Sequence, residues 1–326
     1  MNLLEALSSN LLSPAVLFFA LGMVAALVKS ELKFPEPIYA GITIYLLVAI
    51  GFKGGVAVAE AGFAKVWLPA CAAIILGALI PLWCYPLLRH AGKLRSVDAA
   101  AVAAHYGSVS AVTFIAATNY LSAVNQPYEN YAAAFLAVME SPAILVGVIL
   151  GKLTASGRHG FAWQELRSAF SEAVLGKSIF LLLGALLVGA LCGKSGMEKV
   201  GPFFVTPFQG VLALFLLEMG LVAGRRLEDL RKVGVFLLAF GVLMPLIHGI
   251  LGVVAGKLTG LGLGGATLMG VLAASASYIA APAAIRISLP EANPTLYLTS
   301  SLAITFPFNI TVGIPVYFAI ARWLYA

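Results

Sequence analysis

The chain has 326 residues, of which 61% are apolar and 10% are charged, with a formal net charge of +6. Its mean hydropathy is +0.99. A soluble domain carries about 25% charged residues, so this composition excludes a soluble globular fold. The lysines and arginines lie in separate short loops rather than in a stripe with aromatic residues, which argues against a nucleic-acid-binding surface.

Apolar segments of membrane-spanning length follow one another along the whole chain. The first group lies at 11–29, 37–58, 66–89, 98–123 and 131–152. The second group lies at 178–193, 205–224, 232–256, 263–287 and 294–323. The sequence therefore predicts an all-α integral membrane protein with about ten transmembrane helices and no room for a soluble catalytic domain.

The longest polar stretch separates the two groups and carries apolar residues at helical spacing, beginning with Trp163, Leu166 and Phe170. This pattern predicts a short amphipathic helix on the membrane surface. We expect three regions: a first five-helix repeat at 1–152, a cytoplasmic linker at 153–177, and a second, inverted five-helix repeat at 178–326.

The loops on one predicted face hold 14 of the 20 lysines and arginines. Basic residues collect in cytoplasmic loops, so this face is predicted to be cytoplasmic and both termini extracytoplasmic. We expect a multi-pass protein of the cell inner membrane.

Three short patterns recur in matching segments of the two groups. Gly77-Ala-Leu-Ile-Pro-Leu recurs from Gly241, Ser108-Val-Ser recurs from Ser275, and Pro142 matches Pro307. The near-constant offsets indicate a duplication. A repeat with an odd number of spans enters the second half from the opposite face, so the copies are inverted, as is typical of secondary transporters.

Carriers with inverted repeats bind solute at mid-membrane, where paired helices are broken. Small and hydroxyl residues and Pro282 predict such breaks near 108–110 and 277–281. A half-helix N-terminus there favours an anion, although small residues also serve tight helix packing. The candidate substrate-binding residues are Gly107, Ser108, Val109, Ser110, Ala111, Ser277, Tyr278, Ile279 and Ala280.

Ionisable residues inside apolar segments need a partner or a purpose. Glu140 is assigned either to ion coupling or to a structural ion pair, and a pair between Lys53 and Glu218 is left open. His105 and His248 are interpreted as structural, because no ligand constellation surrounds either residue. The three cysteines show no metal-site or disulfide spacing. We expect no metal centre and no cofactor.

Several motifs resemble the sodium-dependent bicarbonate transporter family. They are Leu12-Ser13-Pro14, Phe34-Pro35-Glu36-Pro37, Gly54-Gly55, Val97-Asp98-Ala99, Met139-Glu140-Ser141-Pro142-Ala143, Glu228-Asp-Leu-Arg231-Lys232, Pro290-Glu-Ala292-Asn293-Pro294 and Ser300-Ser301. The resemblance implies ten spans in a five-plus-five inverted arrangement, a homotrimer, and symport of sodium with bicarbonate between broken helices. It also implies that Thr113 and Ser275 join Glu140 and Lys53 as ion-coupling candidates.

The chain departs from the family where the family has Ser-Asp-Ile-Ser-Gly-Pro-Pro and this sequence continues from Ser277 through Tyr278 to Ala283. Tyr278 removes a carboxylate and adds a phenol donor, and Lys53 introduces an ammonium that replaces a sodium charge. Transport is therefore expected to depend little on sodium, although neutral oxygens and Glu140 leave a sodium site open, and proton coupling through Glu140 is the alternative. The linker is shorter than in cyanobacterial members, which weakens the expectation of their soluble regulatory partner.

The leading interpretation is a carrier of a small anion, with bicarbonate first and another small carboxylate second. The alternative from a different class is a non-transporting membrane scaffold or sensor that retains the fold. An enzyme is not expected, because the loops contain no nucleophile with a paired base, no nucleotide loop and no metal cluster.

Overall fold

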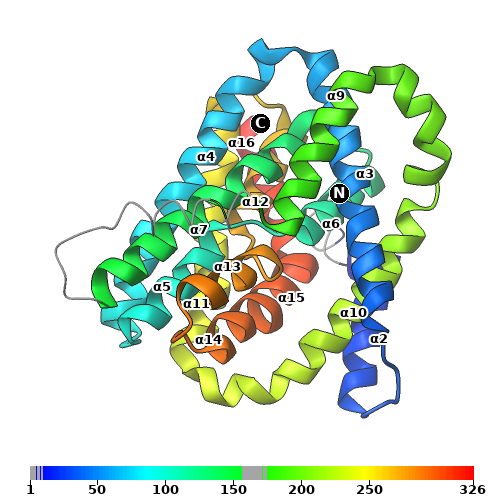
Figure 1. Ribbon diagram of the computed structural model, residues 1–326. Helices are drawn as coiled ribbons and strands as arrows, with labels where there is room; N and C mark the ends of the chain where they lie inside the picture. Colours follow the sequence, from blue (N-terminus) through cyan, green and yellow to red (C-terminus); the bar gives the residue numbers. More distant parts are fainter. Residues whose placement is uncertain (1–4, 6–7, 9, 156–170, 172–174) are drawn as a thin grey trace.

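The computed structural model describes all residues except 1–4, 6–7, 9, 156–170 and 172–174. Within this part of the chain the regular elements are helices, and no strand is formed (Figure 1). Seven helical segments are long and apolar enough to cross a membrane, and Pro14–Leu27 and Leu263–Ala274 are shorter apolar helices. These observations agree with the predicted all-helical class.

The helices follow the predicted apolar segments in order. The first half forms α2 (Pro14–Leu27), α3 (Glu36–Ala61), α4 (Phe63–Pro86), the π-helical turn η1 (Leu87–Ala91), α5 (Ser96–Gly107), α6 (Ala111–Ala123), the 3₁₀ turn η2 (Asn130–Ala132) and α7 (Ala133–Ala155). The second half forms α9 (Lys177–Phe204), α10 (Phe208–Arg226), η3 (Leu227–Asp229), α11 (Leu230–Leu258), α12 (Leu263–Ala274), α13 (Ala280–Ser288), α14 (Pro294–Leu298), η4 (Thr299–Thr305), α15 (Phe306–Phe308), η5 (Asn309–Gly313) and α16 (Ile314–Tyr325).

The sixth predicted segment ends at 193, where α9 is kinked at Gly193, whose φ of 57° and ψ of −156° are non-helical. Glycine adopts this conformation without a Cβ clash. Helical residues continue beyond this kink to Phe204. Lys194 beyond the kink pairs with Glu60 of α3 at 3.6 Å. The predicted amphipathic helix of the linker lies largely outside the described residues.

Local sequence signals explain where several helices begin. Ser13 caps α2 by accepting a hydrogen bond from the Val16 N–H at 3.4 Å, and Pro14 occupies the first helical position. Asn293 and Pro294 repeat this arrangement at α14. Both caps satisfy a backbone donor that the first turn of a helix leaves free. At α12 the support is not local: the Glu129 carboxylate accepts a hydrogen bond from the N–H of the N-cap residue Gly262 at 2.7 Å.

The helices form two groups that lie against each other. In one group α3 packs along α9 and α2 packs along α10, and Figure 1 shows these four helices together at the right of the view. In the other group α4, α5 and α7 pack together, as do α11, α12 and α16. The interrupted helices α5/α6 and α12/α13 belong to this second group.

Glycines bring the paired helices of the first group into backbone contact. A Cβ at Gly55 of α3 would overlap the carbonyl oxygen of Leu186 in α9. A Cβ at Gly220 of α10 would overlap the carbonyl oxygen of Phe19 in α2. Such close approach is the usual role of small residues between membrane helices.

Many large apolar side chains face outward. Leu191 of α9 is 79% exposed and Val235 of α11 is 81% exposed, and further exposed apolar residues lie on α2 and α4. An apolar surface of this extent is unsuited to water. A lipid bilayer is the solvent that suits both this surface and a helical backbone with internally satisfied hydrogen bonds.

Candidate functional site

Two helices are interrupted where the sequence predicts breaks. Helix α5 ends at Gly107 and α6 begins at Ala111, so residues 108–110 form the first break. Helix α12 ends at Ala274 and α13 begins at Ala280, so residues 275–279 form the second. The predicted interruption of both helices is confirmed, although the second break starts two residues earlier than expected.

The two breaks cross and are joined by hydrogen bonds. The Ser110 N–H donates to the Ser275 hydroxyl oxygen at 3.0 Å, and the Ser277 N–H donates to the His105 carbonyl oxygen at 2.9 Å. Asn309 of η5 donates from its side chain to the Ala274 carbonyl oxygen at 2.8 Å. These bonds satisfy backbone groups that would otherwise be buried without a partner.

Serine side chains cap the helices that leave the crossing. The Ser110 hydroxyl accepts hydrogen bonds from the Thr113 N–H at 3.2 Å and from the Thr113 hydroxyl at 3.0 Å. The Ser277 hydroxyl accepts from the Ala281 N–H at 3.1 Å. Pro282 has no N–H in the first turn of α13, so it leaves no donor unsatisfied there.

Other backbone donors at the same two helix starts are free. Across the described residues, the N–H groups of Ala111, Val112 and Ala280 make no hydrogen bond. Helix N-termini carry a positive partial charge of roughly half an elementary charge. Free N–H groups at such ends form a binding site for an anion.

A small cavity of about 20 Å³ lies at the crossing. Seven of the predicted site residues line it: Val109, Ser110, Ala111, Glu140, Ser277, Tyr278 and Ile279. The walls are completed by Leu47 of α3, Leu136 of α7, and Ser178 and Leu182 of α9. Its volume is close to the space needed by one water molecule. Because α3 and α9 belong to one helix group and α7 and the two breaks to the other, the cavity lies where the two groups meet.

Two polar side chains of the cavity lack well-formed hydrogen bonds. Glu140 is 7% exposed and forms no hydrogen bond or ion pair with any described residue. The buried hydroxyl group of Tyr278 makes no well-formed hydrogen bond in this part of the chain, although the Ser110 side chain lies close to it. The Tyr278 ring packs edge-on against Phe306, with the ring centroids 5.1 Å apart. A buried polar group without a partner is costly unless a bound species satisfies it.

The other predicted site residues lie around the crossing rather than in the cavity wall. Gly107 lets α5 pack against Pro81 and Ala143. Ser108 is fully buried, and its hydroxyl has no hydrogen-bond partner among the described residues. Thr113 and Ser275 hold Ser110 in place. Ala280 lines a larger neighbouring cavity.

Lys53 lies apart from the other candidates. It is exposed and lines a separate cavity of about 50 Å³ together with Phe114 and Thr118. It forms no ion pair with Glu218 in the described structure. The two predicted structural histidines are buried: His105 contacts the Ala101 carbonyl oxygen at 2.7 Å, and His248 accepts a hydrogen bond from Trp83 at 2.9 Å.

Sequence reasoning did not identify four lining residues, Leu47, Leu136, Ser178 and Leu182, as site residues. A signal for Ser178 was present, because it lies 165 positions after Ser13, the capping serine of α2. The three leucines carry no comparable signal, since their position depends on which face of α3, α7 and α9 meets the crossing.

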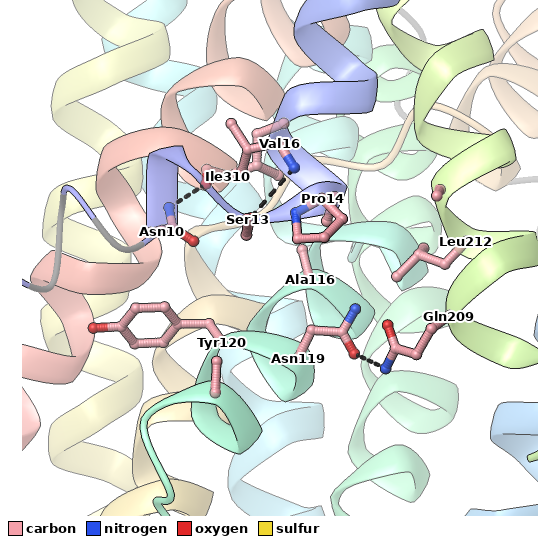
Figure 2. Close-up of a pocket in the computed structure, with 13 residues that line it drawn as sticks. Asn10, Ser13, Pro14, Val16, Ala116, Asn119, Tyr120, Gln209, Leu212 and Ile310 are labelled. Carbon is pink, nitrogen blue, oxygen red and sulfur yellow. Dashed lines mark hydrogen bonds between the residues drawn. The ribbon is translucent and has the colours of Figure 1, made fainter. Parts of the chain in front are cut away.

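Two larger cavities flank the crossing. Figure 2 shows one of about 320 Å³, lined by residues that include Ser13 and Ala116 and bordered by a 2.6 Å hydrogen bond from Gln209 to Asn119. The other has about 490 Å³ and is lined by residues that include Lys177 and Ala283. This second cavity shares Ser178 and Ile279 with the small cavity, so the two adjoin.

An apolar helical chain whose interrupted helices cross at a small cavity with hydroxyl groups and a carboxylate in its wall has the architecture of a membrane transport protein. A family model described as the Na+-dependent bicarbonate transporter superfamily matches residues 14–322. The chain therefore belongs to that superfamily, and the resemblance found in its motifs is confirmed. No curated protein matches the chain. Membership of a transporter family implies transport rather than catalysis.

Proposed function

We propose that this protein is a secondary transporter of a small anion, with bicarbonate as the first candidate and another small carboxylate as the second. The observation that carries this proposal is the set of free N–H groups on Ala111, Val112 and Ala280 at two helix starts. Backbone N–H groups bind oxyanions through charge-assisted hydrogen bonds. Bicarbonate has three oxygens in one plane and can accept such bonds from both helix starts.

The surroundings of the crossing also support an anion. Hydroxyl groups of Ser178, Ser277 and Tyr278 line the small cavity and can donate hydrogen bonds. The adjoining cavity carries the cation Lys177. A positive group in a low-dielectric vestibule raises the local concentration of anions.

The proposal includes an inverted repeat of five spans at 1–152 and five at 178–326. Equivalent close contacts support it. The contact of Gly220 with Phe19 corresponds to that of Gly55 with Leu186, through offsets of 165 and 167 residues. Two helix pairs from different halves thus pack in the same way, as a twofold-related repeat requires.

The arrangement suits alternating access. The small cavity of about 20 Å³ has room for about one water molecule and is too small for a bicarbonate ion. The crossing is therefore in a closed state. The two flanking cavities use equivalent positions, since Ser13 matches Ser178 and Ala116 matches Ala283 at offsets of 165 and 167. In the proposed cycle they are the two vestibules, and the bond between Gln209 and Asn119 closes one of them by joining α10 to α6.

Membrane location, orientation and assembly belong to the same proposal. The charge pattern supports extracytoplasmic termini in the cell inner membrane. Three further features rest on the family resemblance alone: the homotrimer, the sodium coupling and the soluble regulatory partner. Tyr278 weakens the expectation of sodium coupling, and the short linker weakens that of the regulatory partner.

Uptake of labelled bicarbonate into proteoliposomes tests this function. Vesicles that contain the protein and are preloaded with unlabelled bicarbonate should take up labelled bicarbonate faster than protein-free vesicles. The same assay with labelled formate and formate-loaded vesicles tests the carboxylate alternative. Protein-free vesicles report the background from carbon dioxide diffusion. Uptake at the background rate with both anions would contradict transport and favour the scaffold or sensor interpretation.

A further inference from the structure

Glu140 places a carboxylate in the wall of the cavity that is proposed to bind the anion. It lies on α7, it is 7% exposed, and its side chain lines the small cavity at the crossing. Neither a hydrogen bond nor an ion pair with any described residue compensates its charge. An ionised carboxylate in such surroundings is strongly disfavoured.

The elements packed around Glu140 offer no compensating cation. Among the cavity-lining residues, the one other titratable group is Tyr278, whose hydroxyl is a neutral donor that makes no well-formed hydrogen bond with the described residues. Charged groups of the neighbouring elements are directed elsewhere. Lys53 of α3 and Lys177 of α9 line other cavities, and His105 of α5 contacts Ala101. Asp98 of α5 pairs with Arg95, and Lys65 of α4 and Arg286 of α13 are exposed.

A bound anion would add a second negative charge to the same cavity. Two negative charges a few ångströms apart in a buried site repel strongly, so one of them is neutralised. The anion keeps its charge because the free N–H groups of Ala111 and Val112 stabilise it. Glu140 is then the group that must become neutral.

We propose that Glu140 takes up one proton with each anion that binds, so that the coupling ion of this chain is a proton rather than sodium. The inference rests on the proposed anion site. A proton from solution adds to a carboxylate oxygen when the anion enters, and it leaves from the same oxygen when the anion is released on the other side. The pair carries no net charge when the anion is monovalent.

Tyr278 fits this coupling. A phenol keeps a hydrogen-bond donor in the cavity for the anion or for Glu140, but it adds no negative charge. A second carboxylate at this position would have provided a further oxygen ligand for a metal cation. With Tyr278, Glu140 is the one carboxylate among the residues that line the cavity.

Isothermal titration of the purified protein with bicarbonate tests the inference. Comparing the binding heat in two buffers with different ionisation enthalpies gives the number of protons taken up per anion bound. Bicarbonate and protons interconvert with carbon dioxide, which crosses bilayers freely, so binding is a cleaner readout than vesicle acidification. The variants are Glu140→Gln, which is permanently neutral, and the control Glu198→Gln, which alters an exposed carboxylate on α9.

The titration is made at a pH high enough for Glu140 to be ionised in the empty site, and there the wild-type protein and Glu198→Gln should take up about one proton per anion. At lower pH, where Glu140 is already neutral, the proton uptake should disappear. Glu140→Gln should bind the anion without proton uptake, and replacing sodium with choline should leave wild-type affinity unchanged. Anion binding by the wild type at the higher pH without proton uptake, equal uptake by Glu140→Gln, or loss of binding in choline would overturn the inference. If Glu140→Gln does not fold, the wild-type proton count and the choline titration decide. No binding of bicarbonate or formate by the wild type would instead refute the anion site itself.

Discussion

The Ser110 N–H and the Ser275 hydroxyl oxygen lie 3.0 Å apart and form a hydrogen bond between the two interrupted helices. Ser110 belongs to the first half of the chain and Ser275 to the second. The site is therefore completed only when the two halves dock, and the orientation of the free N–H of Ala111 depends on this bond.

Replacing Ser275 with alanine tests this dependence. Ser275→Ala leaves the buried Ser110 N–H without an acceptor, at a cost of about 1–3 kcal/mol. We expect a lower melting temperature in detergent and weaker bicarbonate binding. The matched control is Ser301→Ala, because Ser301 is equally buried but bonds only within its own helix, to the Tyr297 carbonyl oxygen at 2.7 Å. Equal bicarbonate affinities in the two variants would contradict the assigned role of Ser275.

Tyr278→Phe separates binding from stability. The Tyr278 hydroxyl makes no well-formed hydrogen bond with the described residues, so its removal should change the melting temperature little. If this hydroxyl donates to the bound anion, affinity should fall by about tenfold or more. Calorimetric titration of both proteins measures the difference, and an unchanged affinity would remove Tyr278 from the site.

The glycine contacts of the first helix group predict paired effects. Gly55→Ala and Gly220→Ala each place a Cβ against backbone, which should destabilise the protein by about 1–3 kcal/mol. Gly41→Ala on α3 and Gly210→Ala on α10 are controls, because nothing lies within 4 Å of a Cβ at either position. Melting temperatures in detergent should fall for the first two variants alone. A marked difference between Gly55→Ala and Gly220→Ala would count against the internal symmetry.

Local signals made the two breaks predictable. Small hydroxyl residues interrupt the apolar runs at Ser108, Ser110, Ser275 and Ser277. Pro282 lacks a backbone donor. Glu140 was also identifiable, since a carboxylate inside an apolar segment requires a physical reason.

Features that depend on tertiary packing were less predictable. Lys53 lies apart because its side of α3 faces α6 rather than the crossing. The spacing of apolar residues in the sequence does not specify which side of α3 faces which helix. The helical piece of α9 after the kink at Gly193 was not predicted, because Lys194 and Glu198 interrupt the apolar run, and in the structure Lys194 pairs with Glu60. Leu47 and Leu182 enter the cavity wall through the docking of the two helix groups.

Cysteine labelling tests the proposed orientation. In a chain whose exposed Cys71 and Cys192 are replaced by alanine, Arg231→Cys should react with a membrane-impermeant maleimide only after the cells are opened. Lys65→Cys, at an exposed position in the first turn of α4, should react in intact cells. Labelling of the Arg231→Cys protein from outside would reverse the proposed topology.

The central claim is that free backbone N–H groups bind the anion, and Ala111→Pro tests it most directly. Ala111 is the first residue of α6, a position that proline accepts, and Ser110 before it has the extended φ of −115° and ψ of 113° that a following proline favours. The variant removes one free N–H, whereas the control Ala111→Ser retains it.

Calorimetric titration with bicarbonate should show affinity about tenfold or more weaker for Ala111→Pro than for the wild type and Ala111→Ser, because a hydrogen bond to a charged group is lost. The melting temperatures of the three proteins without anion should agree. An Ala111→Pro protein that binds bicarbonate as tightly as the wild type would contradict the account.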